Sequence, residues 1–490
     1  MEIIKNLFPG WALQRAKARH EIDQLTRYYD AAQNSTYRKK PKGSRNAQAI
    51  TQQGATRLRD YARDLDENHD LAIGILDTLV NNIVGTGIPI SPIVQNADGT
   101  LDEKLNTHIS RVFADWKRRP EASRTLPFDE MTRQVCRSWL RDGEVLTQRI
   151  KGNTPAIQHH SGVPYSLELI EADYLPFDLN TAKPKKIVQG IEVNTWARPI
   201  AYHLLKSDPT EIYSVNTRSE DTKRVEADKI FHVKFTRRVN QVRGVSVLHG
   251  VITRLDDIKN YEESERIAAQ VAASMTGYVK KSPEMRQELP DEETPKQREY
   301  EMSPGMIFTD LLPGEEIGTI SSDRPNTGLD DFRSSMLKAA ASGTGVNYSS
   351  ISKNYDGSYS SQRQSMIEAL PGYEKMRNYF IEVFIRPMYH DFLDMAILSG
   401  AVQIPKGINR ETLYDVDIRG VLLPWIDPKK EVEADVIAIN NGLKARVDVI
   451  RERGGDPVNI NKLIELDEFK PVAETAAPAV NQVAEDEETA

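Results

Sequence analysis

The amino-acid sequence predicts an α+β fold made of more than one packed unit. Stretches with helical periodicity surround a central region, 143–235, in which short β-branched and aromatic runs alternate with Gly, Pro and Asn. A small insert with strand-like runs, 276–320, separates two later helical stretches. The chain has 490 residues, too many for a single core, and 39% of them are hydrophobic. We therefore expect at least two units with cores of their own.

The first part of the chain is expected to be mainly helical. Apolar residues recur at helical spacing in 11–30 and again in 56–82. A strand-like run, 88–94, follows, and then helices are expected near 101–118 and 128–141.

The central region predicts an antiparallel β structure. Its strand-like runs are EVLTQRI, YSLELI, KIVQGIEV, PIAYHLL and KIFHVKF. Short, well-separated runs of this kind are typical of strands that pair with their sequence neighbours.

A long helix is expected from Leu248 to Ser274. One face of it is apolar, with Leu248, Val251, Ile252, Leu255 and Ile258, whereas Asp256, Asp257 and Glu263 lie on the other. The insert that follows contains the strand-like runs GYVKK, MIFTD and EEIGTI.

Helices are predicted again at 328–342 and 359–399. The second contains Pro371 and Pro387, so we expect it to kink or break there. A helical region at 428–469 precedes an acidic end that is too poor in large apolar residues to fold.

Charge is unevenly distributed along the chain. Residues 1–60 carry twelve Lys and Arg against five Asp and Glu, whereas the remaining residues carry 52 against 67. Proteins that bind DNA tightly neutralise its phosphates with basic residues, so the acidic body disfavours such binding. For the basic run RKKPKGSR, 38–45, a solvated loop is the favoured interpretation. The apolar stretch 71–90 is interrupted by charged and amide residues, so no membrane span is expected.

Patterns that could bind a metal are incomplete. DLDENHD, 64–70, has His69 and Ile75 where a calcium loop needs Gly and Glu, so a polar helix junction is favoured. Asp415 and Asp417 share one face of a strand but have no third ligand nearby. The nine histidines, including the neighbours His159 and His160, show no ligand spacing, and Cys136 is the single cysteine. We expect no catalytic cluster, no cofactor and no metal.

The segment GTGVNYSSISKNYDGSYSSQRQS, 343–365, is open to different interpretations. Ser350 and Lys353 have the spacing of a serine nucleophile and its base, which would make the chain a serine acyl hydrolase. The motif is short and lacks a second Lys-Thr-Gly element. A solvent-exposed hinge is another interpretation.

Six stretches, in this order along the chain, resemble blocks of the lambda-family phage portal proteins. They are RLRDYARDLDENHDLAIGILDTLVNNIVGTGIPISP (57–92), LRDGEVLTQR (140–149), GVSVLHGVITRLDDIKNYEESERIAAQVAAS (244–274), the segment 343–365 with its YSSQR, FIRPMY (384–389) and WIDPKKEVEADVIAINNGLKAR (425–446). The resemblance spans nearly the whole chain, and its specificity comes from the ordered set.

The resemblance implies a homo-dodecameric ring at one capsid vertex, whose central channel carries double-stranded DNA during packaging and ejection. It implies that the ring docks the terminase large subunit, which supplies the chemical energy, and the head-tail connector or adaptor. Major capsid protein and scaffold are further expected partners. The protein is then expected in the virion, and in the host cytoplasm during assembly, with no enzymatic activity and no contact with a membrane.

The same resemblance divides the chain into the parts of a portal: a mixed wing domain, a helical stem, a small α/β clip insert and a helical crown. The expected boundaries are an N-terminal arm at 1–50, wing at 51–243, stem helices at 244–275 and 328–342, clip at 276–327, a tunnel loop at 343–365, a long kinked helix at 366–399, crown at 400–470 and a disordered acidic tail at 471–490.

Two sets of site residues follow from this division. The residues expected to line the DNA channel are Gly343, Gly345, Ser349, Ser350, Lys353, Asn354, Tyr355, Gly357, Ser358 and Tyr359. Those expected to dock the motor in the clip are Glu284, Arg286, Glu292, Glu293, Lys296 and Arg298. An acidic channel with small hydroxyl residues would repel phosphate, and glycines would let the loop change shape.

Overall fold

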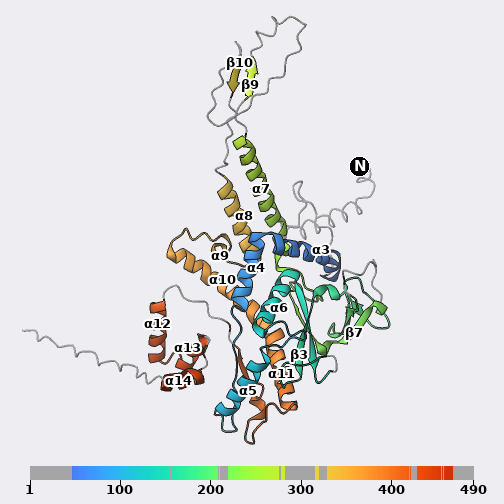
Figure 1. The fold of residues 1–490 in the computed structure, drawn as a ribbon, viewed down its shortest axis with the longest axis vertical. Helices are drawn as coiled ribbons and strands as arrows, with labels where there is room; N and C mark the ends of the chain where they lie inside the picture. The colour runs from blue at the N-terminus through green and yellow to red at the C-terminus, as the bar shows by residue number, and fades with distance from the viewer. Residues whose placement is uncertain are drawn as a thin grey trace, which may run out of the picture.

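The computed structural model describes a body from which a pair of helices projects (Figure 1). The described residues are 47–154, 157–207, 209, 219–274, 278–281, 315–318, 328–418, 420, 428–453, 455 and 457–466. Helices and antiparallel strands both occur in the body, which confirms the α+β prediction. Residues 1–46, which are most of the expected arm at 1–50, and 467–490, which include the expected tail at 471–490, lie outside the described residues, whereas 47–50 belong to a helix.

Three helices form the centre of the body. They are α3 (Ala47–Asn68), α4 (Asp70–Ile83) and α6 (Phe128–Asp142). His69 separates the first two: its Nδ1 accepts the N–H of Leu71 at 3.3 Å, and its Nε2 lies 2.9 Å from the carbonyl oxygen of Leu255. The stretch DLDENHD is therefore the polar helix junction that the sequence favoured.

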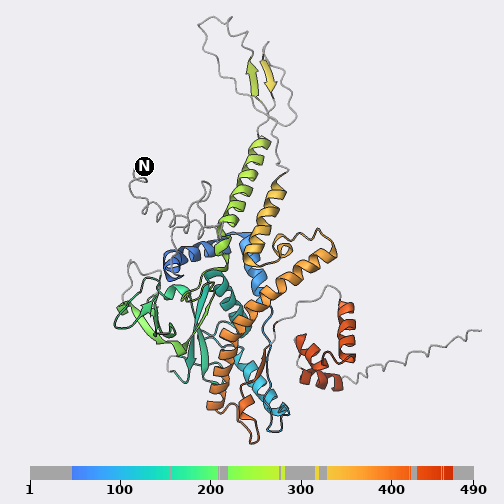
Figure 2. The same cartoon turned by 180° about the vertical axis from the view of Figure 1, so that it is seen from behind.

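The end of the body opposite the projecting helices is built from chain segments far apart in sequence. Strand β1 (Ile90–Pro92) pairs antiparallel with β11 (Val416–Ile418), and α5 (Glu103–Trp116) lies beside them. Figure 2 shows this end beside the lower part of a long helix, α11 (Arg386–Leu398).

Two small antiparallel sheets make up the β region. The first has the order β3 (Tyr165–Ile170), β2 (Glu144–Lys151) and β8 (Ile230–Lys234); the second runs β4 (Ile187–Val188), β5 (Ile191–Val193), β6 (Pro199–Leu205) and β7 (Thr222–Glu226). The antiparallel prediction is confirmed, but β7 was missed. Its sequence TKRVE carries too many charges to show a strand pattern.

Short helical turns connect these elements. They are Ala172–Tyr174, Ser219–Asp221, Ala227–Lys229, Val247–Gly250 and Arg410–Thr412.

The main core joins the helices to one face of the first sheet. At its centre Phe113, Trp116 and Phe392 pack within 5.6 Å between ring centroids, and Trp116 also stacks on Tyr165. The indole N–H of Trp116 donates to the Tyr165 carbonyl at 2.8 Å, so this ring is both buried and hydrogen-bonded. A second, smaller core lies under β5, β6 and β7.

The projecting pair consists of α7 (Ile252–Ser274) and α8 (Leu329–Thr344). Beyond its far end, β9 (Tyr278–Lys281) pairs antiparallel with β10 (Glu315–Gly318). All five apolar residues predicted on one face of the first helix are buried, which confirms that face. The run MIFTD lies outside the described residues.

A long helical run crosses the body after a short helix, α9 (Tyr348–Ser352). It consists of α10 (Tyr359–Phe380), a π-helical turn at Ile381–Ile385, and α11 (Arg386–Leu398). Pro371 lies inside α10 without ending it, so of the expected kink or break only the break is excluded there. The carbonyl that Pro371 leaves without a helical partner belongs to Ile367, an exposed residue that water can reach. The α-helical pattern changes instead at the π turn, next to Pro387.

The expected C-terminal helices are present as α12 (Pro428–Asn440), α13 (Arg446–Glu452) and α14 (Pro457–Leu466). Arg451 Nε lies 3.6 Å from Asp417 Oδ2, which links α13 to β11. No helix in the described part of the chain is long and apolar enough to cross a membrane.

Candidate channel-lining segment and buried charge network

Residues 343–365 are helical over more of their length than expected. Helix α8 continues to Thr344, α9 occupies 348–352, and α10 begins at Tyr359. Only 345–347 and 353–358 lie outside helices. Figures 1 and 2 both show this segment on the side of the body opposite β7.

Asn347 anchors the segment to the body. Its buried side chain accepts hydrogen bonds from the Ser349 N–H at 3.1 Å and from the Ser365 hydroxyl at 2.8 Å. Its own N–H donates to the Tyr373 hydroxyl at 3.2 Å. Because Ser365 and Tyr373 belong to α10, one residue fixes both ends of the intervening loop.

The loop at 353–358 is exposed throughout. Lys353, Asn354, Tyr355 and Asp356 all face solvent, and Ser358 begins α10 by accepting the Ser361 N–H at 3.2 Å. The loop is held locally: Asn354 Oδ1 accepts the Asp356 N–H at 2.7 Å. The tip is therefore accessible while its ends are fixed.

The glycines of the segment have structural roles. A Cβ on Gly343 would lie 2.6 Å from Val251 Cγ1, so this glycine allows α8 to approach the start of α7. Gly345, with φ of 74°, ends α8 in the left-handed conformation. Neither lies in the exposed loop, which contains the third expected glycine, Gly357; mobility provided by a glycine stays a prediction for that position alone.

The segment is not acidic. Between 343 and 365 it carries Lys353 and Arg363 against the single carboxylate of Asp356. Hydroxyl and amide side chains make up most of the rest. This segment therefore does not itself supply an acidic lining, and the acidic character of the channel as a whole stays a prediction.

The serine acyl hydrolase interpretation fails on geometry. It requires a desolvated lysine beside the serine, but Lys353 is exposed and ends α9 in the left-handed conformation, with φ of 54°. Its N–H donates to the Ser349 carbonyl at 3.0 Å.

Other candidate sites can also be placed. All six expected motor-docking residues, Glu284, Arg286, Glu292, Glu293, Lys296 and Arg298, lie outside the described residues. In the described part of the chain no group of three or more His, Cys, Asp or Glu side chains could hold a metal ion. His159 is partly buried, with its Nδ1 2.8 Å from the Ser166 hydroxyl, and Cys136 is buried in α6.

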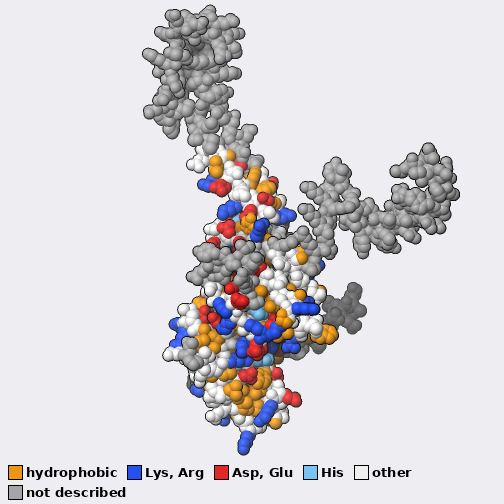
Figure 3. Space-filling view, turned by 90° about the vertical axis from the view of Figure 1, so that its right-hand side faces the viewer, with side chains coloured by type: hydrophobic (Ala, Val, Ile, Leu, Met, Phe, Trp, Pro, Cys, Tyr) orange, Lys and Arg blue, Asp and Glu red, His pale blue; other side chains and the backbone are white. Residues whose placement is uncertain are grey.

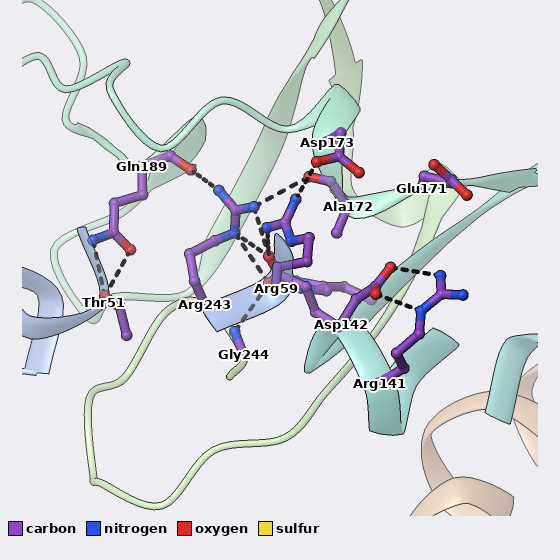
Figure 4. A network of polar contacts seen from close by, with 12 residues as sticks. Thr51, Arg59, Arg141, Asp142, Glu171, Ala172, Asp173, Gln189, Arg243 and Gly244 are labelled. Carbon is purple, nitrogen blue, oxygen red and sulfur yellow. Dashed lines mark hydrogen bonds and ion pairs between the residues drawn. The ribbon is translucent and has the colours of Figure 1, made fainter. Parts of the chain in front are cut away.

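Sequence reasoning missed a buried charge network at the base of the projecting helices (Figure 4). Arg243, which precedes α7, places Nη2 2.6 Å from Glu144 Oε1 at the start of β2, and both side chains are fully buried. The Gly244 N–H donates to Glu144 Oε2 at 2.9 Å, and His232 Nε2 lies 3.1 Å from the same oxygen. Arg243 Nη1 also donates to the Gln189 carbonyl at 2.9 Å.

The network fixes the charge states of its members. Burial by itself would raise the pKa of Glu144, but the charge of Arg243 and the hydrogen bond from His232 outweigh it and hold that pKa well below its usual range. Burial lowers the pKa of His232, which therefore is neutral, with Nε2–H donating to Glu144. Glu144 is thus an ionised, buried carboxylate with all its partners in place.

The α3 helix joins this network through two arginines one turn apart. Arg59 Nη1 donates to Asp173 Oδ1 at 2.8 Å, and Arg59 Nη2 lies 3.5 Å from Glu144 Oε1. Arg63 forms a two-point ion pair with Asp142 at the end of α6, at 2.8 and 3.1 Å. The network therefore ties α3, α6, the β region and the start of α7 together.

Four charged residues of this network lie inside the sequence stretches that resemble portal proteins. Arg59 and Arg63 lie in RLRDYARDL, and Asp142 and Glu144 lie in LRDGEVLTQR. Nothing in a single sequence distinguishes these charges from solvated ones, because most charged residues are exposed.

Two glycines, Gly143 and Gly244, allow two backbone segments to pass in direct contact beside the buried network. A Cβ on Gly244 would lie 1.9 Å from the Gly143 carbonyl oxygen, and a Cβ on Gly143 would lie 2.2 Å from the Val245 carbonyl carbon. Gly143 has φ of 87°, a conformation that favours glycine. The start of the α7 segment is thus in direct backbone contact with the α6–β2 junction.

A second buried carboxylate joins the long helix to the first sheet. Asp391 of α11 pairs with Arg149 and Lys151 of β2 and accepts the Tyr165 hydroxyl at 3.3 Å. These ion pairs fix α11 against the sheet.

Comparison with known proteins adds the family. The family model for the phage portal protein, lambda family, matches residues 33–377. The chain is 26% identical over 427 residues to a probable portal protein of Halomonas phage phiHAP-1, which covers 84% of this chain and 79% of that protein. It is 28% identical over 153 residues to portal protein B of Escherichia phage lambda, covering 30% of this chain and 29% of that protein.

Among solved structures, a chain in the neck of a native GTA particle, computed with C12 symmetry, is similar with a TM-score of 0.44 and 14% identity. The similarity covers 81% of this chain and 94% of that one, and it is too low to assign the fold by itself. The family model, in contrast, spans more than half of the chain, from the helical centre through the projecting pair and into α10. The chain belongs to the lambda family of phage portal proteins.

Proposed function

We propose that twelve copies of this chain form a closed ring at one capsid vertex, and that double-stranded DNA passes through its central channel. In this arrangement α7 and α8 form the stem, and β9 and β10 belong to the clip at its end. The loop at 353–358 faces the duplex. The remaining parts keep the roles set out above for wing (51–243), long helix (366–399) and crown (400–470).

One observation carries the placement of the loop. A short exposed loop, fixed at both ends by Asn347, lies beside the base of the projecting pair and on the opposite side of the body from the β region. A duplex moving through a ring must not be bound tightly, and one lysine among hydroxyl and amide groups per subunit provides only weak attraction. Because both ends of the loop are fixed, we expect it to keep one position beside the duplex and not to swing freely.

The partners follow from this arrangement. The clip end would dock the terminase large subunit during packaging and the head-tail connector afterwards, and the outer side would contact the major capsid protein and scaffold. The chemical energy for packaging would come from the terminase, and we assign no catalytic step to this chain. Assembly would take place in the host cytoplasm, before the ring becomes part of the virion.

The loop assignment is tested by adding positive charge. We expect the variant Asn354→Lys, Asp356→Lys, Ser358→Lys to assemble normally, because all three residues are exposed. Every subunit would then add a cluster of cations, and each neutralised phosphate strengthens a salt-dependent attraction. Packaging with purified motor should slow at low salt and recover as the salt concentration rises.

The first control is Ser350→Ala, which should package at the normal rate. The second places added lysines elsewhere in the β region, as Glu168→Lys with Glu226→Lys, both of which are exposed, and it should also leave the rate unchanged. Normal packaging by the loop variant at every salt concentration would show that 353–358 does not face the duplex.

A further inference from the structure

Trp196 is unusually exposed for a tryptophan. It lies at the tip of the hairpin between β5 and β6, and 89% of its surface is accessible, whereas Trp116 and Trp139 are 1% exposed. The neighbouring Ile200 is also 42% exposed. A large aromatic side chain in this position leaves much apolar surface in water, which is typical of a contact that another molecule covers.

The hairpin tip is rigid. Asn194 Oδ1 accepts the N–H groups of both Trp196 and Arg198, each at 2.9 Å. The Asn194 N–H donates to the Arg198 carbonyl at 3.0 Å, and Ala197 closes the turn in the left-handed conformation, with φ of 61°. A tip held in this way loses little conformational entropy when Trp196 is buried by a partner.

Basic side chains surround the tip. The Val193 N–H donates to the Lys186 carbonyl, so the exposed run with Lys183, Lys185 and Lys186 lies alongside the start of the tip, and Arg198 follows it. Lys183, Lys186 and Arg198 form no ion pair with any described residue.

The nearby carboxylates are already paired within the sheet. Glu192 lies 2.8 Å from Arg224 and 3.3 Å from Lys185, and Glu226 lies 3.1 Å from Lys229. The surface around Trp196 therefore has an excess of free positive charge, and its complement is a negatively charged surface with an apolar pocket.

We propose that the Trp196 tip, with its rim of Lys183, Lys186 and Arg198, docks into an acidic, apolar-centred pocket on the protein shell around the ring. This inference rests on the proposed ring, because the β region faces outward only if the loop at 353–358 faces the channel; the two lie on opposite sides of the body. On the face shown in Figure 3, basic, apolar and acidic side chains are interspersed.

A nucleic-acid partner fits the surface less well. Single strands are bound by several aromatic side chains along a basic groove, on which successive bases stack. Here one aromatic ring projects from a convex tip, with an aliphatic side chain, Ile200, as its exposed apolar neighbour. Trp and Arg on a rigid projection are the residue types enriched at the centres of protein interfaces.

The test compares ring formation with shell incorporation in cells that make the full-length chain together with the major shell protein of the same phage. Two variants are used: Trp196→Ala, and the double change Lys183→Glu and Lys186→Glu. We expect both to form rings like the unchanged protein, seen by electron microscopy of the purified chain. The fraction of shells that contain a ring should fall at least tenfold for each.

The matched control is Val239→Ala. Val239 is also 89% exposed, but it lies near the end of β5 that is opposite the tip. The carbonyl of the next residue, Asn240, accepts a hydrogen bond from the Gln48 side chain, and the Gln48 carbonyl accepts one from Gln189, just before β5. This variant should be incorporated normally.

Normal incorporation of both test variants would overturn the proposal and leave the ring assignment intact. Loss of ring formation in both variants would overturn it in a different way, because the tip would then be a contact between copies of this chain. Salt-dependent binding of a single-stranded oligonucleotide that disappears in Trp196→Ala would assign the tip to nucleic acid instead. Absence of rings in the unchanged protein would contradict the proposed function itself.

Discussion

Arg243 and Glu144 carry opposite charges where water does not reach them. Removing one member of such a pair leaves the other charged and buried, which costs about 3–5 kcal/mol. We therefore expect Arg243→Ala to lower the free energy of unfolding by about that amount, measured by urea denaturation.

The matched control is Arg118→Ala. Arg118 pairs with Asp115 at 3.8 Å, and both side chains are more than half exposed, so its loss should change stability by less than about 1 kcal/mol. Equal effects of the two substitutions would show that the buried network does not stabilise the fold.

The shifted pKa values of His232 and Glu144 make the free energy of unfolding depend on pH. Burial lowers the pKa of His232 and of His203, so the unfolded chain binds these protons at a higher pH than the folded chain does. Stability should therefore fall as the pH drops below about 6.5, the ordinary value for histidine. The lowered pKa of Glu144 adds stability above about pH 4.3, which is lost as the pH falls further.

Thermal unfolding between pH 4 and 8 measures this profile. The variant His232→Gln keeps a donor for Glu144 but cannot titrate. Its melting temperature should therefore fall less than that of the unchanged protein as the pH drops below about 6.5. A melting temperature that stays constant from pH 7.5 to 5.5 in the unchanged protein would contradict the assignment of neutral, buried histidines.

At the scale of elements, the crossing of two backbone segments fixes the base of the projecting helices. Because a Cβ on Gly244 would lie 1.9 Å from a backbone oxygen, Gly244→Ala should separate α7 from the α6–β2 junction and prevent stable folding. A Cβ on Gly74, inside α4, would meet no neighbouring element within 4 Å, so Gly74→Ala should stabilise the protein by about 1 kcal/mol. Circular dichroism melts distinguish the two outcomes; a Gly244→Ala protein as stable as the unchanged chain would contradict the close approach.

The elements that the sequence predicted well are those whose pattern is local. The apolar face predicted for the helix at 248–274 repeats every helical turn, and all five of its predicted members are buried, although Leu248 and Val251 precede α7. The short helix α9 was missed because its start depends on Asn347 and its packing on α4 and α8, which no local pattern reveals. The burial of Arg243 and Glu144 is likewise a tertiary property, so these charges could not be separated from solvated ones.

The strand pair β9 and β10 is marginal by itself. Two strands without a third or a covering helix are seldom stable in water, and among the described residues each of these strands pairs only with the other. We expect a neighbouring subunit to supply further strand pairing to their free edges. Hydrogen exchange at 278–281 and 315–318 should therefore be fast in the dissociated chain and slow in the ring; equal exchange rates in both states would rule out pairing between subunits.

At the scale of the whole molecule, the body separates two surfaces of different chemistry. On one side lies the anchored loop at 353–358, and on the other lies the β region with Trp196 at a hairpin tip. The buried network connects α3 and the β region to the start of α7, so the projecting pair is rigidly joined to the body at its base. A closed ring would place the first surface around the channel and the second against the shell.

The central claim is tested most directly by an electron cryomicroscopy reconstruction of the purified full-length chain. The account predicts a closed ring in which 353–358 is nearest to the axis, α7 and α8 line the stem, and Trp196 faces outward. A monomeric or open particle, or a ring in which 353–358 lies on the outer surface, would contradict it.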